Sequence, residues 1–375
     1  MRRPLILHPH YQASCIVRPA DHYKPTTAAP NNTGPSAYSL LITSSVPAPK
    51  KKKLLILLKV CIGIGLLVLL IGKIDFEQFK ERMKQVPLQS YLFGVAIYMG
   101  GMAVRTLRWK LLLSAVEEKL PLSMLIRFQF IGSFFNQFLP TSVGGDGVRV
   151  YFLWREKISW EKAVGSVLVE RIVGMLMLVL LGLIAAGAGY HLYRNNWIYL
   201  ILAALLVIMV TGTMILFSGR AARLIIRFID KLGLTKLSHL FNRFSEGLRI
   251  YRSHPPALIG VTLLSFAYQL VVIWLFYYFS RQLGMDLSIW YFLLFIPIVM
   301  SVSQVPISPN GTGVREWACA LLFTGVGADE AQAVALAICY WLLQLGPGIL
   351  GGVLFGLTNS MKILDDMKEM DERNE

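Results

Sequence analysis

Long apolar runs follow one another along the chain between residues 54 and 357. Runs of roughly 20 apolar residues match the thickness of a bilayer core. We therefore predict full membrane-spanning helices over residues 54–72, 89–103, 163–190, 197–217, 257–279 and 331–357. Two shorter runs, 124–139 and 289–305, each lead into a segment rich in proline and glycine. The predicted fold class is an all-α polytopic integral membrane protein, with about six full transmembrane helices plus two re-entrant half-helices.

The two proline- and glycine-rich segments are copies of one motif. The first runs from Asn136 to Arg149 and the second from Pro306 to Arg315. Aligned on their prolines, they match at six of ten positions: Pro140/Pro306, Ser142/Ser308, Gly145/Gly311, Gly147/Gly313, Val148/Val314 and Arg149/Arg315. Paired interruptions of this kind mark the substrate site in transporters built from inverted repeats, so we predict such a repeat here.

The distribution of basic residues indicates how the short runs enter the membrane. Basic residues around Arg105 and Arg108, and the basic segment 219–255, both predict cytoplasmic loops. Three apolar runs separate these two loops, and three full crossings would place the loops on opposite sides of the membrane. The loops lie on the same side only if the run 124–139 enters the membrane and returns. If 289–305 also returns, it enters from the opposite face, and both termini are cytoplasmic.

Polar residues in and near the two motifs are candidates for binding a lipid phosphate. Glycines expose backbone N–H groups, helix N-termini favour anions, and guanidinium groups fit phosphate. Nearby carboxylates would balance the arginines, or contact a cationic headgroup or a proton, and charges inside a membrane indicate function. The candidate substrate-binding residues are Asn136, Ser142, Gly145, Asp146, Gly147, Arg149, Glu170, Arg171, Ser308, Gly311, Gly313, Arg315 and Glu316. In the alternative interpretation, the arginines of the two motifs anchor the membrane interface, and Glu170 and Arg171 only pair with their neighbours.

The remaining segments define the domain organisation. Residues 1–49 predict a disordered N-terminal tail, because they are rich in Pro, Ser, Thr, Ala and Asn. Residues 50–360 form the predicted transmembrane domain, and residues 361–375 a charged C-terminal tail. Within the domain, residues 219–255 carry eight basic and two acidic residues, with apolar residues at helical spacing. This segment predicts an amphipathic connector on an anionic cytoplasmic leaflet.

Composition supports a membrane protein and narrows its chemistry. Charged residues make up 16% of the chain, whereas soluble domains carry about 25%. The net charge of +15 is concentrated beside apolar spans, so attraction to anionic lipid accounts for it, and no nucleic-acid partner is predicted. The four cysteines form no CxxC pair and the six histidines lie in the tail or loops, so we predict no metal or cofactor. The sequence has no Walker A motif and no carboxylate pair at catalytic spacing, which makes an enzyme the weaker prediction.

The same residues carry a resemblance to a known family. Over roughly residues 54–358 the chain resembles the transmembrane region of lysylphosphatidylglycerol synthases, at residues 135–140, 144–146, 149, 170–171 and 306–316. The resemblance implies a flippase-like, multi-pass protein of the cytoplasmic (inner) membrane. It also implies relatives that move aminoacylated phospholipid between leaflets or act in polyprenyl- or hopanoid-linked pathways. Full-length synthases continue into a soluble aminoacyl-transferase domain, and this chain ends at Glu375, so we expect that activity to be absent. Pro309 and Asn310 replace a more usual glycine-rich run, which implies a stiffer second loop.

Together these observations predict translocation of a phosphate-bearing lipid between the leaflets of the cytoplasmic membrane. Arg149 and Arg315 would bind the phosphate, and Glu170 and Asp146 would balance charge or couple to protons. The expected partners are anionic, aminoacylated or polyprenyl-phosphate lipids, together with a protein of envelope biosynthesis. Two alternatives stay open. One is a membrane-embedded transferase or accessory subunit in lipid or cell-envelope glycan synthesis. The other is a scaffold that docks a partner through 219–255.

Overall fold

The computed structural model describes residues 76–138, 144–188, 196–231, 233–304 and 308–372, together with Gly65 and Gly72. All elements assigned in these ranges are helices, and they belong to the unit formed by residues 53–375. They are α3 (Phe76–Gln85), α4 (Leu88–Ala115), α5 (Leu122–Phe138), α6 (Gly144–Arg155), α7 (Trp160–Ala188), α8 (Asn196–Phe217), α9 (Gly219–Lys231), α10 (Thr235–Ile250), η2 (Tyr251–Ser253), α11 (Pro255–Gln282), α12 (Ile289–Ser303), η3 (Pro309–Gly311), α13 (Val314–Thr324) and α14 (Glu330–Glu372).

Some sequence predictions fall outside the described residues. These are the N-terminal tail, nearly all of the first predicted span, both residues of the matched pair Pro140/Pro306, and Ser142 of the first motif. At the other end of the chain, α14 continues through Glu372, so helix occupies most of the segment predicted as a charged tail.

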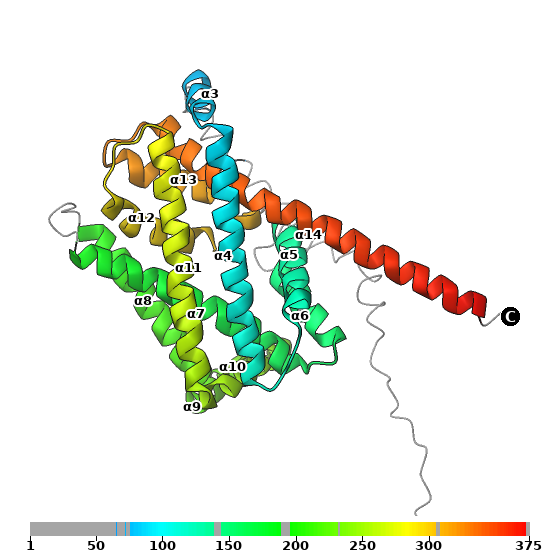
Figure 1. Cartoon of the computed structure of the whole chain (residues 1–375). Coiled ribbons are helices and arrows are strands. Elements are labelled where there is room, and N and C mark those ends of the chain that lie inside the picture. The colour runs from blue at the N-terminus through cyan, green and yellow to red at the C-terminus, as the bar shows by residue number, and fades with distance from the viewer. Residues whose placement is uncertain are drawn as a thin grey trace, which may run out of the picture. The chain divides into compact units, whose positions relative to one another are not determined.

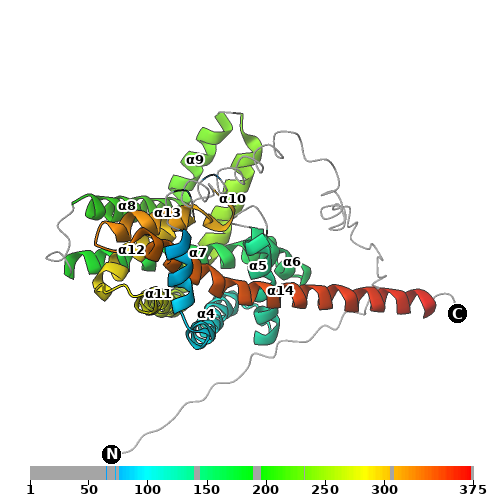
Figure 2. The same ribbon diagram turned by 90° about the horizontal axis from the view of Figure 1, so that it is seen from above.

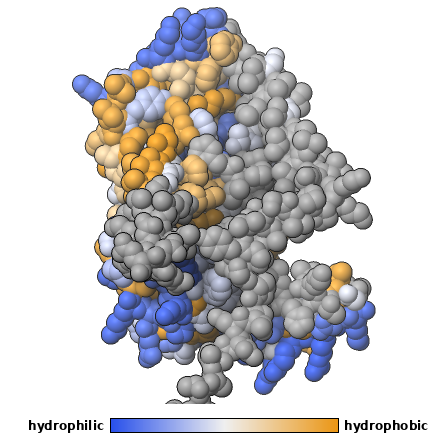
Figure 3. Space-filling model, turned by 90° about the vertical axis from the view of Figure 1, so that its right-hand side faces the viewer, coloured by the Kyte–Doolittle hydropathy of each residue, from blue (hydrophilic) through white to orange (hydrophobic). Residues whose placement is uncertain are grey.

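Four described helices are long and apolar enough to cross a membrane: α7, α8, α11 and α14. Helix α12 is a shorter apolar helix of 15 residues. Several large apolar side chains face outward, among them Ile259 and Leu263 of α11, which are 62% and 65% exposed. Figure 3 shows apolar side chains on the upper part of one face, with hydrophilic side chains toward the ends of the molecule. The chain is therefore an all-α polytopic membrane protein, as its apolar runs predict.

Helices α4 and α11 run side by side through the bundle (Figures 1 and 2). Each has 28 residues, which corresponds to a length of about 42 Å. At one end, Val116 after α4 shares an apolar cluster with Tyr251, just before α11 begins. At the other end, the Oγ of Ser90 near the start of α4 donates to the Oε1 of Gln282, 3.2 Å away, at the end of α11. The pair is therefore antiparallel and connects the two ends of the bundle.

The first motif forms a helical hairpin, α5 and α6, that starts and finishes at one end of this pair. The Nζ of Lys162, at the start of α7, lies 2.6 Å from the Oε1 of Glu118, in the loop before α5. Helices α5 and α6 cross so closely that a Cβ on Gly145 would lie 1.9 Å from the carbonyl oxygen of Gly132. The chain therefore enters the bundle and returns to the same end, as a re-entrant half-helix requires.

The second motif lies in the hairpin of α12 and α13, at the opposite end. The Nε2 of Gln332, near the start of α14, donates to the carbonyl oxygen of Leu283, directly after α11, at 3.0 Å. The carboxylate of Asp329 lies 3.2 Å from the guanidinium of Arg82 in α3. Helix α11 separates this end from the end that holds the first hairpin, so the two hairpins enter from opposite ends, as an inverted repeat predicts.

The tips of the two hairpins meet inside the bundle. The Nδ2 of Asn310 in η3 donates to the Oε1 of Gln137 at the end of α5, with a distance of 2.8 Å. Asn310 has a φ of 49°, in the left-handed region that few residues other than glycine adopt. Its neighbour Gly311 has a φ of 71°, and a Cβ there would lie 2.5 Å from the carbonyl oxygen of Ser303. These two residues therefore restrict the backbone conformation of the second tip.

The basic connector consists of two helices with different surroundings. Helix α10 packs so closely on α7 that a Cβ on Gly165 would lie 2.3 Å from the carbonyl oxygen of Gly247. Helix α9 exposes Leu224 and Phe228 by 65% and 63% beside its basic residues. Helix α9 therefore has exposed apolar and basic side chains, as predicted for an amphipathic connector, while α10 is part of the bundle.

Gly145→Ala should destabilise the protein, whereas Gly147→Ala should not. The new methyl group at position 145 would overlap the Gly132 carbonyl, and overpacking of this kind costs about 1–3 kcal/mol. No atom lies within 4 Å of a Cβ built on Gly147, and alanine favours helix more than glycine does. Thermal unfolding of both variants in one detergent would measure this. Equal melting temperatures would contradict the close crossing.

Candidate functional site

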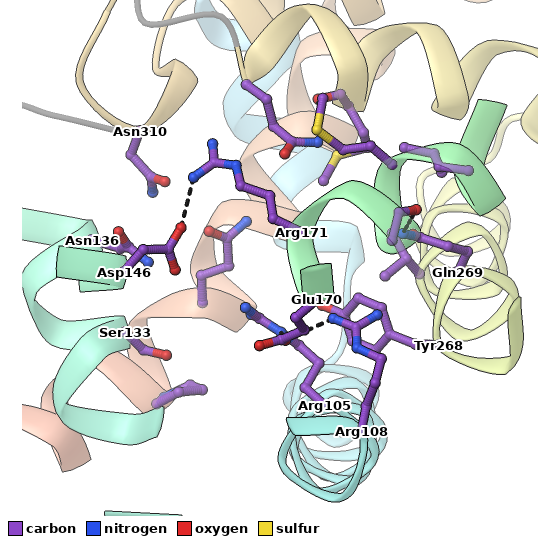
Figure 4. Close-up of a pocket in the computed structure, with 18 of the residues that line it drawn as sticks. Arg105, Arg108, Ser133, Asn136, Asp146, Glu170, Arg171, Tyr268, Gln269 and Asn310 are labelled. Atoms are coloured by element: carbon purple, nitrogen blue, oxygen red, sulfur yellow. Dashed lines mark hydrogen bonds and ion pairs between the residues drawn. The ribbon is translucent and has the colours of Figure 1, made fainter. Parts of the chain in front are cut away.

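A cavity of about 230 Å³ lies where the two hairpin tips meet α4, α7, α11 and α14 (Figure 4). Its walls carry three kinds of polar group. The charged side chains are Arg105, Arg108, Asp146, Arg149, Glu170 and Arg171. Amides and hydroxyl groups complete the polar part: Asn136, Gln137, Gln269, Gln304, Asn310, Gln344, Ser133, Tyr98, Tyr268 and Tyr340.

The carboxylate of Glu170 is the centre of the charged group. It lies in the middle of α7 and is 2% exposed. Its Oε1 accepts a hydrogen bond of 2.7 Å from the Nη2 of Arg108 and lies 3.6 Å from the Nε of Arg105. Its Oε2 accepts from the Nη2 of Arg149. One carboxylate thus joins guanidinium groups from α4 and α6, and such pairing offsets the cost of burying its charge.

Helical spacing places the two α4 arginines on one face. Arg105 and Arg108 are three residues apart, so both side chains point toward α7 and α11. The Nη1 of Arg108 donates to the Oγ of Ser265 in α11, at 2.9 Å. Arg108 is 4% exposed, whereas the side chain of Arg105 is 23% exposed. The less tightly held Arg105 therefore presents more of its surface to the cavity.

Asp146 is the second carboxylate of the site. It lies in the first turn of α6, where the helix dipole stabilises a negative charge. Its Oδ2 accepts from the Nη1 of Arg171 at 2.7 Å, and its Oδ1 lies 3.5 Å from the Nη1 of Arg149. Arg149 therefore connects the two carboxylates, and Figure 4 shows Arg171 directed at Asp146 from α7.

The ring of Trp109 fixes the position of Arg149. The guanidinium carbon of Arg149 lies 4.0 Å from the centroid of this fully buried ring. The ring itself is held by its Nε1, which donates to the Oγ of Ser166 at 3.0 Å. A guanidinium stacked on tryptophan at this distance gains a cation–π attraction that adds to its ion pairs.

Five predicted site residues from the first motif and α7 come together around the cavity: Asn136, Asp146, Arg149, Glu170 and Arg171. Among the predicted glycines, Gly145 belongs to the crossing of α5 and α6, and Gly147 faces open space. The backbone N–H groups expected to bind an anion already have partners. The N–H of Gly145 donates to the Oδ1 of Asn136 at 2.8 Å, and that of Gly313 to the Oε2 of Glu316 at 2.6 Å.

The second motif contributes differently from the first. Arg315 does not line the cavity; its Nη2 lies 2.8 Å from the Oε1 of Glu316, and both side chains are 3% exposed. The guanidinium carbon of Arg315 lies 6.0 Å from the ring centroid of Tyr340, which does line the cavity. Arg315 and Glu316 therefore form a buried pair behind this ring. Gly311 and Gly313 shape the turn with positive φ values, and Ser308 is buried beside them.

Sequence reasoning missed the two arginines of α4. Their place at the end of an apolar run predicts the basic edge of a cytoplasmic loop, but both lie inside a helix that runs on to Ala115. The leucines at positions 111–113, which continue the apolar pattern beyond them, were the available signal. Their partner Glu170 could not be identified in this way, because it lies 62 residues from Arg108 along the chain.

Comparisons with known proteins give a consistent picture. The family model described as the lysylphosphatidylglycerol synthase TM region matches residues 56–352. A UPF0104 membrane protein from Pyrococcus horikoshii is 24% identical over 81% of this chain and 96% of its own length. UPF0104 membrane proteins from Methanothermobacter thermautotrophicus and Methanocaldococcus jannaschii are 20% and 26% identical. The alignments cover 82% and 63% of this chain, and 96% and 98% of those relatives.

Glu170→Gln should strongly destabilise the protein. The substitution removes the negative charge shared by the three arginines, and loss of one partner from a buried ion pair costs about 3–5 kcal/mol. Asp286→Asn provides a control, because this carboxylate also pairs with an arginine but is 94% exposed. Such exposed pairs contribute little. Thermal unfolding in detergent should show a large decrease for the first variant only. A similar melting temperature for both would contradict the central role of Glu170.

Proposed function

The chain belongs to the family of the lysylphosphatidylglycerol synthase transmembrane region, and from this basis we propose that it moves a phosphate-bearing lipid between the leaflets of the cytoplasmic membrane. The observation that carries the proposal is the cavity lined by buried arginines at the meeting point of two oppositely directed hairpins. Charges at this depth of a membrane protein are costly and are typical of a substrate path.

In this proposal the phosphate binds among the cavity arginines. Guanidinium groups form short, bidentate hydrogen bonds with phosphate oxygens. The side chains of Arg105 and Arg171 are 23% and 25% exposed, so they offer the most accessible surface to an entering headgroup. Glu170 and Asp146 balance the arginines before the headgroup arrives, which keeps the empty cavity from carrying four uncompensated charges.

The hairpins provide the two routes by which the headgroup reaches the cavity. Each enters the bundle from a different end, and their tips touch through Gln137 and Asn310. Transporters with inverted repeats expose a central site alternately by moving one repeat against the other. Movement of either hairpin away from the tip contact would open the cavity toward its own end. The acyl chains remain in the bilayer beside the outward-facing apolar side chains.

Arg149→Gln should abolish lipid exchange between leaflets in proteoliposomes. The variant loses the guanidinium that connects both carboxylates and lines the cavity. The assay would follow headgroup-labelled anionic, aminoacylated and polyprenyl-phosphate lipids. Arg281→Gln is the matched control, because Arg281 is a half-exposed arginine at the end of α11, away from the cavity. Size-exclusion chromatography and thermal unfolding would establish that both variants are folded.

Each outcome of the exchange assay has a clear meaning. Exchange by the wild type and the Arg281 variant, with a large loss in the Arg149 variant, supports the proposal. A covalently altered lipid would instead identify a membrane-embedded transferase. If the folded wild type exchanges none of the lipids, the translocase proposal is wrong.

A further inference from the structure

We propose that the cavity is specific for a headgroup with two negative charges, such as a lipid phosphomonoester or diphosphate. A phosphodiester with one negative charge or an aminoacylated phosphodiester would bind less well. This inference rests on the proposed function and names the class of its substrate. It follows from the balance of charge around the cavity, from the protein donors that remain available, and from the places where the accessible arginines lie.

The charge balance is unequal among the described residues that line the cavity. Four of them are arginines and two are carboxylates, Asp146 and Glu170, which leaves a surplus of two positive charges (4 − 2). The remaining polar groups of the lining are amides, tyrosines and a serine, and they add no formal charge. The neighbouring Arg315 and Glu316 pair with each other and leave the surplus unchanged.

A buried surplus of charge is unfavourable unless a ligand compensates it. All four arginines contact one of the two carboxylates, so four guanidinium groups share two negative charges, and the two excess positive charges carry a desolvation cost that an anion can offset. A phosphomonoester with two charges would neutralise the surplus. A phosphodiester would leave one positive charge, and an added amino group would bring a further positive charge into the cavity. The electrostatics therefore favour the dianion over both of the other headgroups.

The hydrogen-bond donors of the lining side chains also favour a phosphomonoester. Within the described part of the chain, the buried Nε atoms of Arg108 and Arg149 and the Nε2 of Gln137 have no hydrogen-bond partner in the protein. Buried donors of this kind are rare, and each is costly when unpaired. A monoester has three terminal oxygens that can accept several hydrogen bonds, whereas a diester has only two. These atoms belong to side chains that line the cavity, so small shifts of those side chains would present them to a ligand rich in acceptors.

The most accessible arginines approach the cavity from different elements. Arg105 extends from α4 and Arg171 from α7, and Figure 4 shows them on opposite sides of Glu170. Their side chains are about equally exposed, at 23% and 25%. A phosphate group in the cavity would therefore approach guanidinium groups that come from two different helices. Contact with guanidinium groups from two helices matches an anion whose charge is spread over several oxygens.

Binding of matched lipids to the full-length protein in detergent would test the inference. Phosphatidic acid and phosphatidylglycerol with identical acyl chains differ in headgroup charge at pH 8, because a phosphomonoester has a second pKa of about 6. We expect phosphatidic acid to bind about tenfold more tightly, which corresponds to a free-energy difference of about 1.4 kcal/mol. Equal affinity, or tighter binding of phosphatidylglycerol, would overturn the inference.

Paired variants separate the charge surplus from the individual contacts. Arg171→Gln lowers the surplus to one (3 − 2), so the preference for phosphatidic acid should fall to about threefold or less. Adding Asp146→Asn restores the surplus to two (3 − 1) and should restore the preference. Arg227→Gln removes an exposed charge from α9 and should leave it unchanged. A double variant as unselective as Arg171→Gln would contradict the charge argument.

The same titration distinguishes this inference from the proposed function. Glycerol 3-phosphate carries the dianionic group without acyl chains, and we expect it to bind much more weakly than phosphatidic acid. If it binds equally well, dianion recognition is supported and the lipid substrate is contradicted. If lipids exchange across the bilayer without a preference for the dianion, the translocase is supported and this inference is wrong.

Discussion

The arrangement of the site depends on one buried carboxylate. Glu170 accepts hydrogen bonds from Arg108 of α4 and Arg149 of α6, while its own backbone belongs to α7. Burial makes this dependence strong, because an unpaired charge in a low-dielectric interior is far more costly than at a surface. The position of the first hairpin relative to the long helices therefore has an electrostatic as well as a packing origin. Trp109 and Ser265 reinforce it by holding two of the arginines from behind.

Much of the fold could be derived from local patterns in the sequence. Apolar runs predict helices, and the duplicated motif together with the basic segments predicts two hairpins entering from opposite ends. Each of these signals lies within a short stretch of chain. The ionic network was not accessible in the same way, because the pairing of Arg108 with Glu170 is a property of how α4 packs on α7. Arginines at the end of an apolar run can equally well mark a loop, and that interpretation was wrong here.

The two copies of the motif also show how a single neighbouring residue can change a role. Arg149 is followed by Val150, so its guanidinium finds carboxylates on other turns and helices. Arg315 is followed by Glu316, which pairs with it directly and caps the start of α13. The equivalence of the two arginines in the sequence alignment thus becomes a difference in the folded protein. A motif repeated in sequence defines equivalent backbone positions, and the residues beside it decide what each side chain contacts.

The tip contact has a mechanical consequence. Gln137 and Asn310 are joined by a hydrogen bond between uncharged amides, and such a bond contributes about 0.5–1.5 kcal/mol. Separating these two side chains breaks no ion pair between them, and water or a polar headgroup can replace the lost partner on either side. The ion pairs of Glu170, by contrast, lie entirely within the first half of the chain and do not connect the two hairpin tips. Displacement of the second hairpin would therefore break only this weak bond between the tips, and it would leave intact the ion pairs that the first hairpin makes with α7.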